Sequence, residues 1–489
     1  MKRVLTATLL MGSASFATAL IGLVNRKLLA NYVGVTGIGV LDQWVDLNVL
    51  MIGLASLGLG DGLIKYVSAF ESSGQSERLR DFLSSVLRVM GGLALVLAGV
   101  LALFSADIAR LIFGSAAYAG LVGLLALTLP CAVGAAALRG VVNGYRQVRY
   151  LALMSILPAF SILIFVWPLV STLHLLGAVI NVVISTALTL AVAGWFFVQS
   201  AGRSFAGAVL RQGRFQPSLL RLVAGFGAVS LIGGFAGSQT LIWVRGFLGV
   251  DSPAAGLFSV INGLSEQALN LALVALGSYS YAQISAMQDR PTIAREVNTT
   301  LRTVVLVGVP LLFGISVGRN VLVPLLFSDK FMGATPLIPL QTLGDLLKIV
   351  FWALALPQLP MGRTRAWLTY WLIWCGTFVG LSYVLIGRYG LAGVVYAHIA
   401  AHALVVVLLY LDGRRVLDLR LAPGTAKLLG SAALLLGSAV LLPGDWVYYP
   451  LFAGLGVAWA ALNVTAGERG AALRAARARL PWLSGGSVA

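Results

Sequence analysis

The sequence has 489 residues, of which 59% are hydrophobic and only 10% are charged. Runs of 18 or more mostly apolar residues recur along the chain, which is typical of membrane-spanning helices, and no polar stretch is long enough for a soluble domain. The formal net charge of +17 would suit a nucleic-acid-binding protein, but the positions of the charges, described below, exclude that class.

The apolar runs predict an all-α polytopic membrane protein with about 14 transmembrane helices. Element ends deduced from sequence are uncertain by about 2–4 residues. The expected helices, in chain order, are 4–30, 43–69, 83–104, 118–142, 150–171, 175–199, 221–246, 255–284, 301–323, 335–358, 365–387, 390–411, 426–442 and 447–465.

The basic residues are distributed unequally between the two sets of predicted loops. With a cytoplasmic N-terminus, the cytoplasmic loops and tails, together with the helix ends that adjoin them, hold 24 of the 34 Lys and Arg residues. The opposite side holds four, which are Arg110, Arg319, Lys330 and Arg388. Such an excess sets membrane orientation. We therefore expect both termini in the cytoplasm and no nucleic-acid partner.

The chain looks like a tandem repeat with an appendix. Six helices in each half give both halves the same orientation, so the repeat is parallel. We expect an N-terminal lobe at 1–206, a C-terminal lobe at 207–412, and two further helices with a basic tail at 413–489. The tail segment ERGAALRAARARLPWL has helical spacing, and we interpret it as an interfacial helix or a docking site for a partner.

Lys27 and Arg245 occupy related places in the two halves. Each lies near the far end of a long apolar segment, and each is followed eleven or twelve residues later by a glycine, Gly256 after Arg245 and Gly39 after Lys27. The two cations are 218 residues apart. This pattern predicts that each lobe presents a cation to a shared central cavity, which would favour an anionic cargo.

Arg26 and Lys348 also lie within predicted helices. A Lys or Arg at mid-membrane costs about 2.5–3.5 kcal/mol. With Lys27 and Arg245 there are four such groups, which together would cost on the order of 10 kcal/mol. They must therefore face water, a counter-charge or a ligand. Lys65 is nearer the cytoplasmic boundary, where its side chain can extend to the interface; it is a weaker candidate for binding.

Four acids are candidate counter-charges or sites for a coupling ion. Asp345 lies three residues before Lys348 on the same helix face, which favours an ion pair between them. Glu266 could reach Arg245, and Asp46 or Asp61 could serve the first helix. Because Arg26 and Lys27 are adjacent, one carboxylate can hardly neutralise both. Arg and Lys in a partly dehydrated cavity suit a phosphate or pyrophosphate.

Several other chemistries find no support in the sequence. The chain has no GxxxxGK[ST] phosphate-binding loop. His398 and His402 have the i, i+4 spacing of metal ligands, but no carboxylate lies within two turns, so we favour packing. The predicted outside loops are short and nearly free of acids, which disfavours a membrane enzyme. We expect no cofactor and no resident metal.

Six stretches carry a family resemblance: KLLANYVGVTGIG (27–39), GLIKYVSAF (62–70), NGYR (143–146), SAMQDRPTIAREV (285–297), LLFSDKF (325–331) and LGDLLKI (343–349). In this order and spacing they resemble the Wzx-type flippases of the multidrug/oligosaccharidyl-lipid/polysaccharide (MOP) superfamily. The similarity covers roughly residues 1–412, and within the family it looks closest to the flippases of enterobacterial common antigen.

The resemblance implies two six-helix lobes around a cationic cavity that opens alternately to each side. Lys27, Arg245, Lys348 and Glu266 match charged positions of the family pattern, whereas Arg26 does not. Helices thirteen and fourteen are additional to the twelve-helix pattern of the family. In having fourteen helices, the expected chain is similar to the lipid II flippases of the same superfamily. The implied function is translocation of undecaprenyl-pyrophosphate-linked oligosaccharide across the bacterial inner membrane, for O-antigen, common-antigen or exopolysaccharide assembly.

The implied partners are the lipid-linked oligosaccharide, membrane lipids, a polysaccharide polymerase and a chain-length regulator. Three rival interpretations stay open. A lipid II flippase or a multidrug exporter of the same superfamily would use the same fold, although an exporter of cations should have an acidic cavity. An inactive scaffold for glycan assembly would not need the buried cations.

Overall fold

The computed structural model describes residues 2–465 and Glu468; the side chains of residues 2–10, 61, 222–226, 268, 270–272, 274, 275, 278, 279 and 282 are not included. The segment proposed as an interfacial or docking helix lies outside the described residues, apart from Glu468. Within the described part the chain is helical and contains no β-strand. The predicted all-α fold is confirmed.

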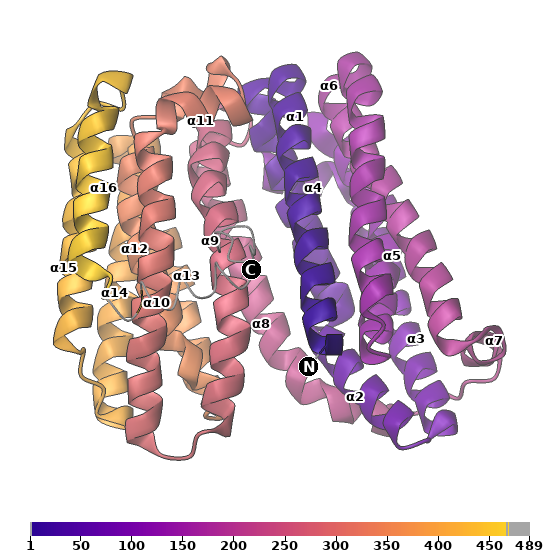
Figure 1. The fold of residues 1–489 in the computed structure, drawn as a ribbon. Coiled ribbons are helices and arrows are strands. Elements are labelled where there is room, and N and C mark those ends of the chain that lie inside the picture. Colours follow the sequence, from indigo (N-terminus) through magenta and orange to yellow (C-terminus); the bar gives the residue numbers. More distant parts are fainter. Residues whose placement is uncertain (1, 466–467, 469–489) are drawn as a thin grey trace, which may run out of the picture. The chain divides into compact units, whose positions relative to one another are not determined.

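The α-helices run along the chain as follows (Figure 1): α1 (Lys2–Ser56), α2 (Gly60–Ser72), α3 (Ser76–Leu103), α4 (Ser105–Phe113), α5 (Ala119–Gly144), α6 (Val148–Ala201), α7 (Arg203–Arg211), α8 (Pro217–Leu248), α9 (Pro253–Ala286), α10 (Arg290–Val317), α11 (Arg319–Leu326), α12 (Ile338–Ala355), α13 (Thr364–Tyr389), α14 (Leu391–Leu417), α15 (Pro423–Leu441) and α16 (Tyr449–Asn463). Short 3₁₀ turns are η1 (Ala116–Tyr118), η2 (Asp329–Ala334), η3 (Leu356–Gln358) and η4 (Trp446–Tyr448).

Ten helical stretches of the described chain are long and apolar enough to cross a membrane. Two of them, Met11–Ser56 and Val148–Ala201, have 46 and 54 residues, more than twice the roughly 20 residues of one crossing. Both contain a sharp kink, at Gly34 in α1 and at His174 in α6. The multi-pass membrane architecture is therefore clear, and the count of 14 crossings stays a prediction.

The kink in α1 changes the expected boundaries near the N-terminus. The sequence predicted a loop between residues 30 and 43, yet only Gly34 leaves helical geometry, with φ +76°, a conformation that favours glycine. The helix then continues to Ser56. The expected helix 43–69 is instead interrupted at residues 57–59, where Leu57 and Gly58 have positive φ. The expected loop at 31–42 and the expected continuous helix 43–69 were therefore wrong.

The break at Gly58 lies in the glycine-rich stretch SLGLGDGLIKY (56–66), whose sequence suits either close helix packing or a flexible gate. A Cβ added at Gly58 would clash with the backbone of Gly227 and Leu231 in α8. The glycine therefore permits close packing of the α1–α2 connection on α8. This contact supports packing rather than a flexible gate.

The chain divides into two compact units. The first comprises the chain up to Val260 with Leu322–Ala334 and Thr364–Ala397; the second comprises Ile261–Val321, Thr335–Arg363 and the chain from His398 onward. In the first unit α1 packs against α6 and α8, and α5 packs between α3 and α6. In the second unit α10 packs against α12, α15 and α16 (Figure 1). The predicted lobe boundaries at 206 and 412 stay predictions.

Candidate functional site

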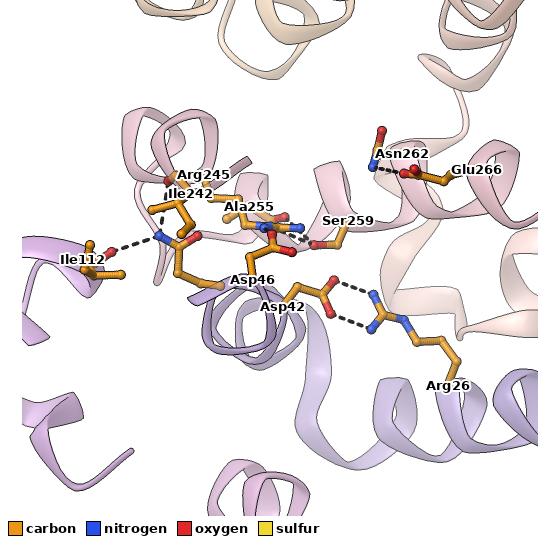
Figure 2. Close-up of polar contacts among 11 residues, drawn as sticks. Arg26, Asp42, Asp46, Ile112, Ile242, Arg245, Ala255, Ser259, Asn262 and Glu266 are labelled. Carbon is orange, nitrogen blue, oxygen red and sulfur yellow. Dashed lines mark hydrogen bonds and ion pairs between the residues drawn. The ribbon is translucent and has the colours of Figure 1, made fainter. Parts of the chain in front are cut away.

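The first unit contains a cluster of buried charges on α1 and α8. Asp42 and Asp46 are four residues apart in the second arm of α1, so both carboxylates leave one face of the helix. Arg26 comes from the first arm of α1 and Arg245 from the last turn of α8. Figure 2 shows the two aspartates on one helix, with Arg26 directed toward Asp42.

Arg26 and Asp42 form a bidentate ion pair across the Gly34 kink. The guanidinium Nη1 donates to Asp42 Oδ1 at 2.7 Å, and Nη2 donates to Oδ2 at 2.6 Å. The side chains are 20% and 17% exposed. The guanidinium carbon also lies 5.8 Å from the centroid of the Phe327 ring. Two parallel charge-assisted hydrogen bonds make this the strong form of an Arg–carboxylate contact.

Arg245 is paired with Asp46, the other carboxylate of the cluster. Its Nη1 donates to Asp46 Oδ2, and its Nε donates to the Ser259 hydroxyl at 3.4 Å. The Arg245 side chain is 5% exposed and lies over the Phe258 ring. This pair joins α8 to α1 (Figure 2). The sequence had suggested that Glu266 could reach Arg245; the partner that the structure gives Arg245 within this unit is Asp46.

Lys27 differs from both arginines. Its ammonium donates to the backbone carbonyl of Pro324 in α11, and the described residues include no ion-pair partner for it. Lys27 is only partly buried. The cluster therefore has three cations and two carboxylates, and one positive charge remains without an acidic partner. A partly buried cation of this kind attracts an anionic ligand.

The charged candidates of the second unit, Lys348, Glu266 and Asp345, form two separate contacts. Lys348 Nζ lies 3.6 Å from Glu266 Oε1. Asn262 Nδ2 donates to Glu266 Oε2 at 3.0 Å (Figure 2). Asp345 does not pair with Lys348, as its spacing had suggested; its Oδ1 lies 3.2 Å from His398 Nε2. The expected Asp345–Lys348 pair is wrong because α14 places an imidazole against Asp345 in the core.

Two further sequence candidates lie on α2. Lys65 is exposed, and its ammonium is 5.3 Å from the centroid of the Tyr66 ring. Asp61 lies in the first turn of α2, and its side chain is outside the described part of the structure. The expectation that Asp46 or Asp61 serves the first helix misses the actual partner of Arg26, which is Asp42. A role for Lys65 and Asp61 in binding stays a prediction.

Three comparisons with known proteins find similarity to polysaccharide-biosynthesis proteins and to membrane transporters. A family model described as "Polysaccharide biosynthesis protein" matches residues 4–284. The lipid III flippase of Escherichia coli (strain K12) is 24% identical over 334 residues, which are 67% of this chain and 78% of that protein. A lipid III flippase of Shigella flexneri matches to the same extent.

Among solved structures, the lipid II flippase MurJ in an inward closed conformation superposes with a TM-score of 0.71 at 16% identity, covering 93% of this chain and 97% of that one. An inward-facing multidrug resistance MATE family transporter of the MOP superfamily gives a TM-score of 0.63 at 16% identity, covering 82% and 94%. At these identities the likeness concerns the fold, which lipid flippases and drug transporters share.

Proposed function

We propose that this chain, which belongs to the polysaccharide biosynthesis protein family, is a flippase that moves undecaprenyl-pyrophosphate-linked oligosaccharide from the cytoplasmic to the periplasmic leaflet of the bacterial inner membrane. The product would feed assembly of a surface polysaccharide such as O-antigen, common antigen or exopolysaccharide. Two flippases of lipid-linked precursors among the similar proteins support the substrate class.

The positive charge in the first unit is the observation that carries the proposal. Three cations and two carboxylates lie together in a membrane-embedded position, and the Lys27 ammonium is held only by a carbonyl among the described residues. A pyrophosphate head group would replace that single neutral acceptor with charged oxygens, which form stronger hydrogen bonds. Lys27 is therefore the residue to which we assign first contact with the phosphates.

Arg26 would join after Lys27. Its fork already binds a carboxylate bidentately, and a phosphate offers the same geometry, so the head group can compete with Asp42. Arg245 is more deeply buried and is bound by both Asp46 and Ser259. We assign it the positioning of α8 against α1 and a contribution to the local positive potential. Lys348 and Lys65 would act at other stages of the passage.

Alternating access would expose this cluster first to the cytoplasm and then to the periplasm. A pyrophosphate carries about two negative charges outward through an inside-negative potential, which favours transport by about 4–5 kcal/mol per 100 mV, because each charge contributes about 2.3 kcal/mol. The return of an unloaded cationic site toward the negative interior is also favoured. The potential can therefore drive the cycle.

A multidrug exporter with this fold is the main alternative. An exporter of organic cations needs a surplus of acids, whereas the described cluster has a surplus of cations. The charge balance thus favours an anionic head group. A purely scaffolding role would not explain why a charged lysine, Lys27, is kept in a membrane-spanning helix, where its burial is unfavourable in free energy.

Vesicles containing the purified full-length protein and a fluorescent polyprenyl-pyrophosphate disaccharide test the proposal. Leaflet exchange is measured with a membrane-impermeant quencher while valinomycin sets a potassium-diffusion potential. We expect outward movement to accelerate when the substrate side is negative, Lys27→Ala to abolish exchange and Lys27→Arg to retain part of it. Lys427→Ala, at an exposed lysine of α15, is the control. Exchange by Lys27→Ala at the rate of the control would refute the assignment.

A further inference from the structure

Three ionisable side chains are buried together in the second unit, apart from the proposed head-group site. Asp345 lies on α12, and His398 and His402 lie one turn apart on α14. Their exposed fractions are 1%, 4% and 1%, respectively. Isolated ionisable groups are rarely buried in membrane-spanning segments, and where they occur they mark ion or proton pathways.

The carboxylate of Asp345 is only half satisfied. Its Oδ1 lies 3.2 Å from His398 Nε2 and accepts from Gln341 Nε2 at 3.4 Å. Its Oδ2 is buried and has no hydrogen-bond partner among the residues that the structure describes. A buried ionised oxygen without a donor is costly. A proton on this carboxylate, or on the imidazole beside it, would remove the negative charge that makes the burial unfavourable.

The two imidazoles restrict how many protons the cluster holds. His402 Nδ1 lies 2.9 Å from the backbone carbonyl of His398, and because a carbonyl only accepts, this nitrogen carries its hydrogen. A further proton on His402 would therefore occupy Nε2. The ring centroids of His398 and His402 are 4.3 Å apart, so two imidazolium ions would repel each other strongly.

The charged side chains described on α12 and α14 beside this cluster are paired with other groups. Lys348 on α12 is 3.6 Å from Glu266 of α9, and Asp412 farther along α14 is paired with Arg363 at 2.6 Å. The helices α10 and α15 pack against α12, and their stretches 303–317 and 428–441 contain no ionisable side chain. The three-residue cluster thus has a charge of about −1 when both histidines are neutral, and one added proton makes it neutral.

We infer that Asp345, His398 and His402 form a proton-binding site that takes up and releases one proton during the transport cycle. The coupling of proton binding to transport rests on the proposed function, whereas the assignment of a proton as the ligand rests on the geometry of the three side chains. A proton suits the site better than a metal ion, because one carboxylate and two imidazoles are present and no group of three or more His, Cys, Asp or Glu in the described chain is arranged to hold a metal.

Proton binding can be measured without transport. The detergent-purified protein is shifted from pH 8 to pH 5 in weak buffer with an indicator dye. We expect the wild type to take up about one proton more than Asp345→Asn or His398→Gln. Asp418→Asn, at an exposed aspartate outside the cluster, is the control. Equal uptake by the wild type and both site variants would overturn the inference.

Coupling is tested in the vesicle assay at zero membrane potential with a pH difference of one unit. If one proton is exchanged per substrate, the leaflet distribution of the fluorescent lipid should shift by about tenfold, because one pH unit corresponds to a factor of ten. Asp345→Asn and His398→Gln should keep exchange but lose this shift, while Asp418→Asn should behave as the wild type.

The two proposals fail in distinguishable ways. A wild type that moves no lipid under any gradient refutes the proposed function, and the proton count remains informative about the site. A wild type that exchanges lipid without any response to the pH difference refutes the coupling. If Asp345→Asn does not fold, His398→Gln and His402→Gln provide the same comparison, because each replaces an imidazole of the cluster by a neutral amide.

Discussion

Gly39 of α1 lies directly against Gly256 of α9. A Cβ added at Gly39 would be 2.9 Å from the Gly256 backbone nitrogen, and one added at Gly256 would clash with the Val35 carbonyl. These are the two glycines that follow Lys27 and Arg245 at matching intervals. The repeated spacing therefore places a close helix contact beside the charged cluster, because only residues without a side chain permit the approach.

Replacing Gly256 by Ala should destabilise the protein. The added methyl group meets backbone atoms that cannot rotate away, and overpacking of this kind costs about 1–3 kcal/mol. We expect a lower midpoint of thermal unfolding in detergent, read by size-exclusion chromatography after heating. Gly263→Ala on the same helix is the matched control, because nothing lies within 4 Å of its Cβ position. Equal midpoints for the two variants would contradict the contact.

The helices of this protein could largely be predicted from sequence, since apolar runs of sufficient length have few other structures in a membrane. The errors occurred where glycine alters the backbone locally. The glycines around Gly34 and Gly39 suggested a loop, but only Gly34 has positive φ. Asp42 consequently seemed to lie outside the helix. Its i, i+4 relation to Asp46 was the signal that would have identified it as a partner for a second cation.

The ion-pair partners could be predicted less well than the helices. Sequence spacing identifies neighbours within one helix, and it suggested a pair between Asp345 and Lys348. The observed partners come from other helices, His398 for Asp345 and Glu266 for Lys348. Contacts of this kind depend on helix rotation and packing, which the hydrophobic pattern alone leaves open. The binding roles of the cations stay predictions.

The Arg245–Asp46 pair should behave as a buried ion pair. Asp46→Ala leaves the Arg245 guanidinium buried with its hydrogen bond to the Ser259 hydroxyl, so we expect a loss of about 3–5 kcal/mol. The double variant Arg245→Met with Asp46→Ala should recover most of that stability, since no charge is then left without a partner.

The measurement is thermal unfolding of all three proteins at equal concentration. Asp107→Ala, which breaks an exposed pair with Arg110, is the control and should change stability by at most about 1 kcal/mol. A double variant as unstable as Asp46→Ala would show that the two residues do not act as a pair.

Asp42→Asn should strengthen binding of a pyrophosphate head group if Asp42 competes with the phosphates for Arg26. A pair of charges 4 Å apart interacts by on the order of 4 kcal/mol at an effective dielectric constant of 20, so the gain should reach at least about tenfold in Kd. Farnesyl pyrophosphate in detergent is a suitable probe, with binding followed by intrinsic tryptophan fluorescence. Asp107→Asn is the matched surface control, and weaker binding by Asp42→Asn than by this control would reject the competition.

The contact between Glu468 and Arg302 should depend on pH in a predictable direction. Glu468 accepts from Arg302 at 2.7 Å and from the Thr465 amide at 2.7 Å. Chiefly the hydrogen bond from Arg302 lowers the pKa of Glu468 from 4.5 to about 2. A lowered folded-state pKa means that the stabilisation is complete above pH 4.5 and is lost as the pH falls toward 2.

Attachment of Asn463 and Glu468 to Arg302 of α10 should therefore be the same at pH 7 and pH 5, and Glu468→Gln should loosen it at both values. Amide hydrogen exchange of a peptide covering Asn463 to Glu468, corrected for the intrinsic pH dependence of exchange, measures the attachment. The Glu468→Gln variant should exchange faster than the wild type at pH 7, because a neutral amide loses the charged hydrogen bond to Arg302. Protection in the wild type that already falls between pH 7 and pH 5 would show that this carboxylate does not hold the segment.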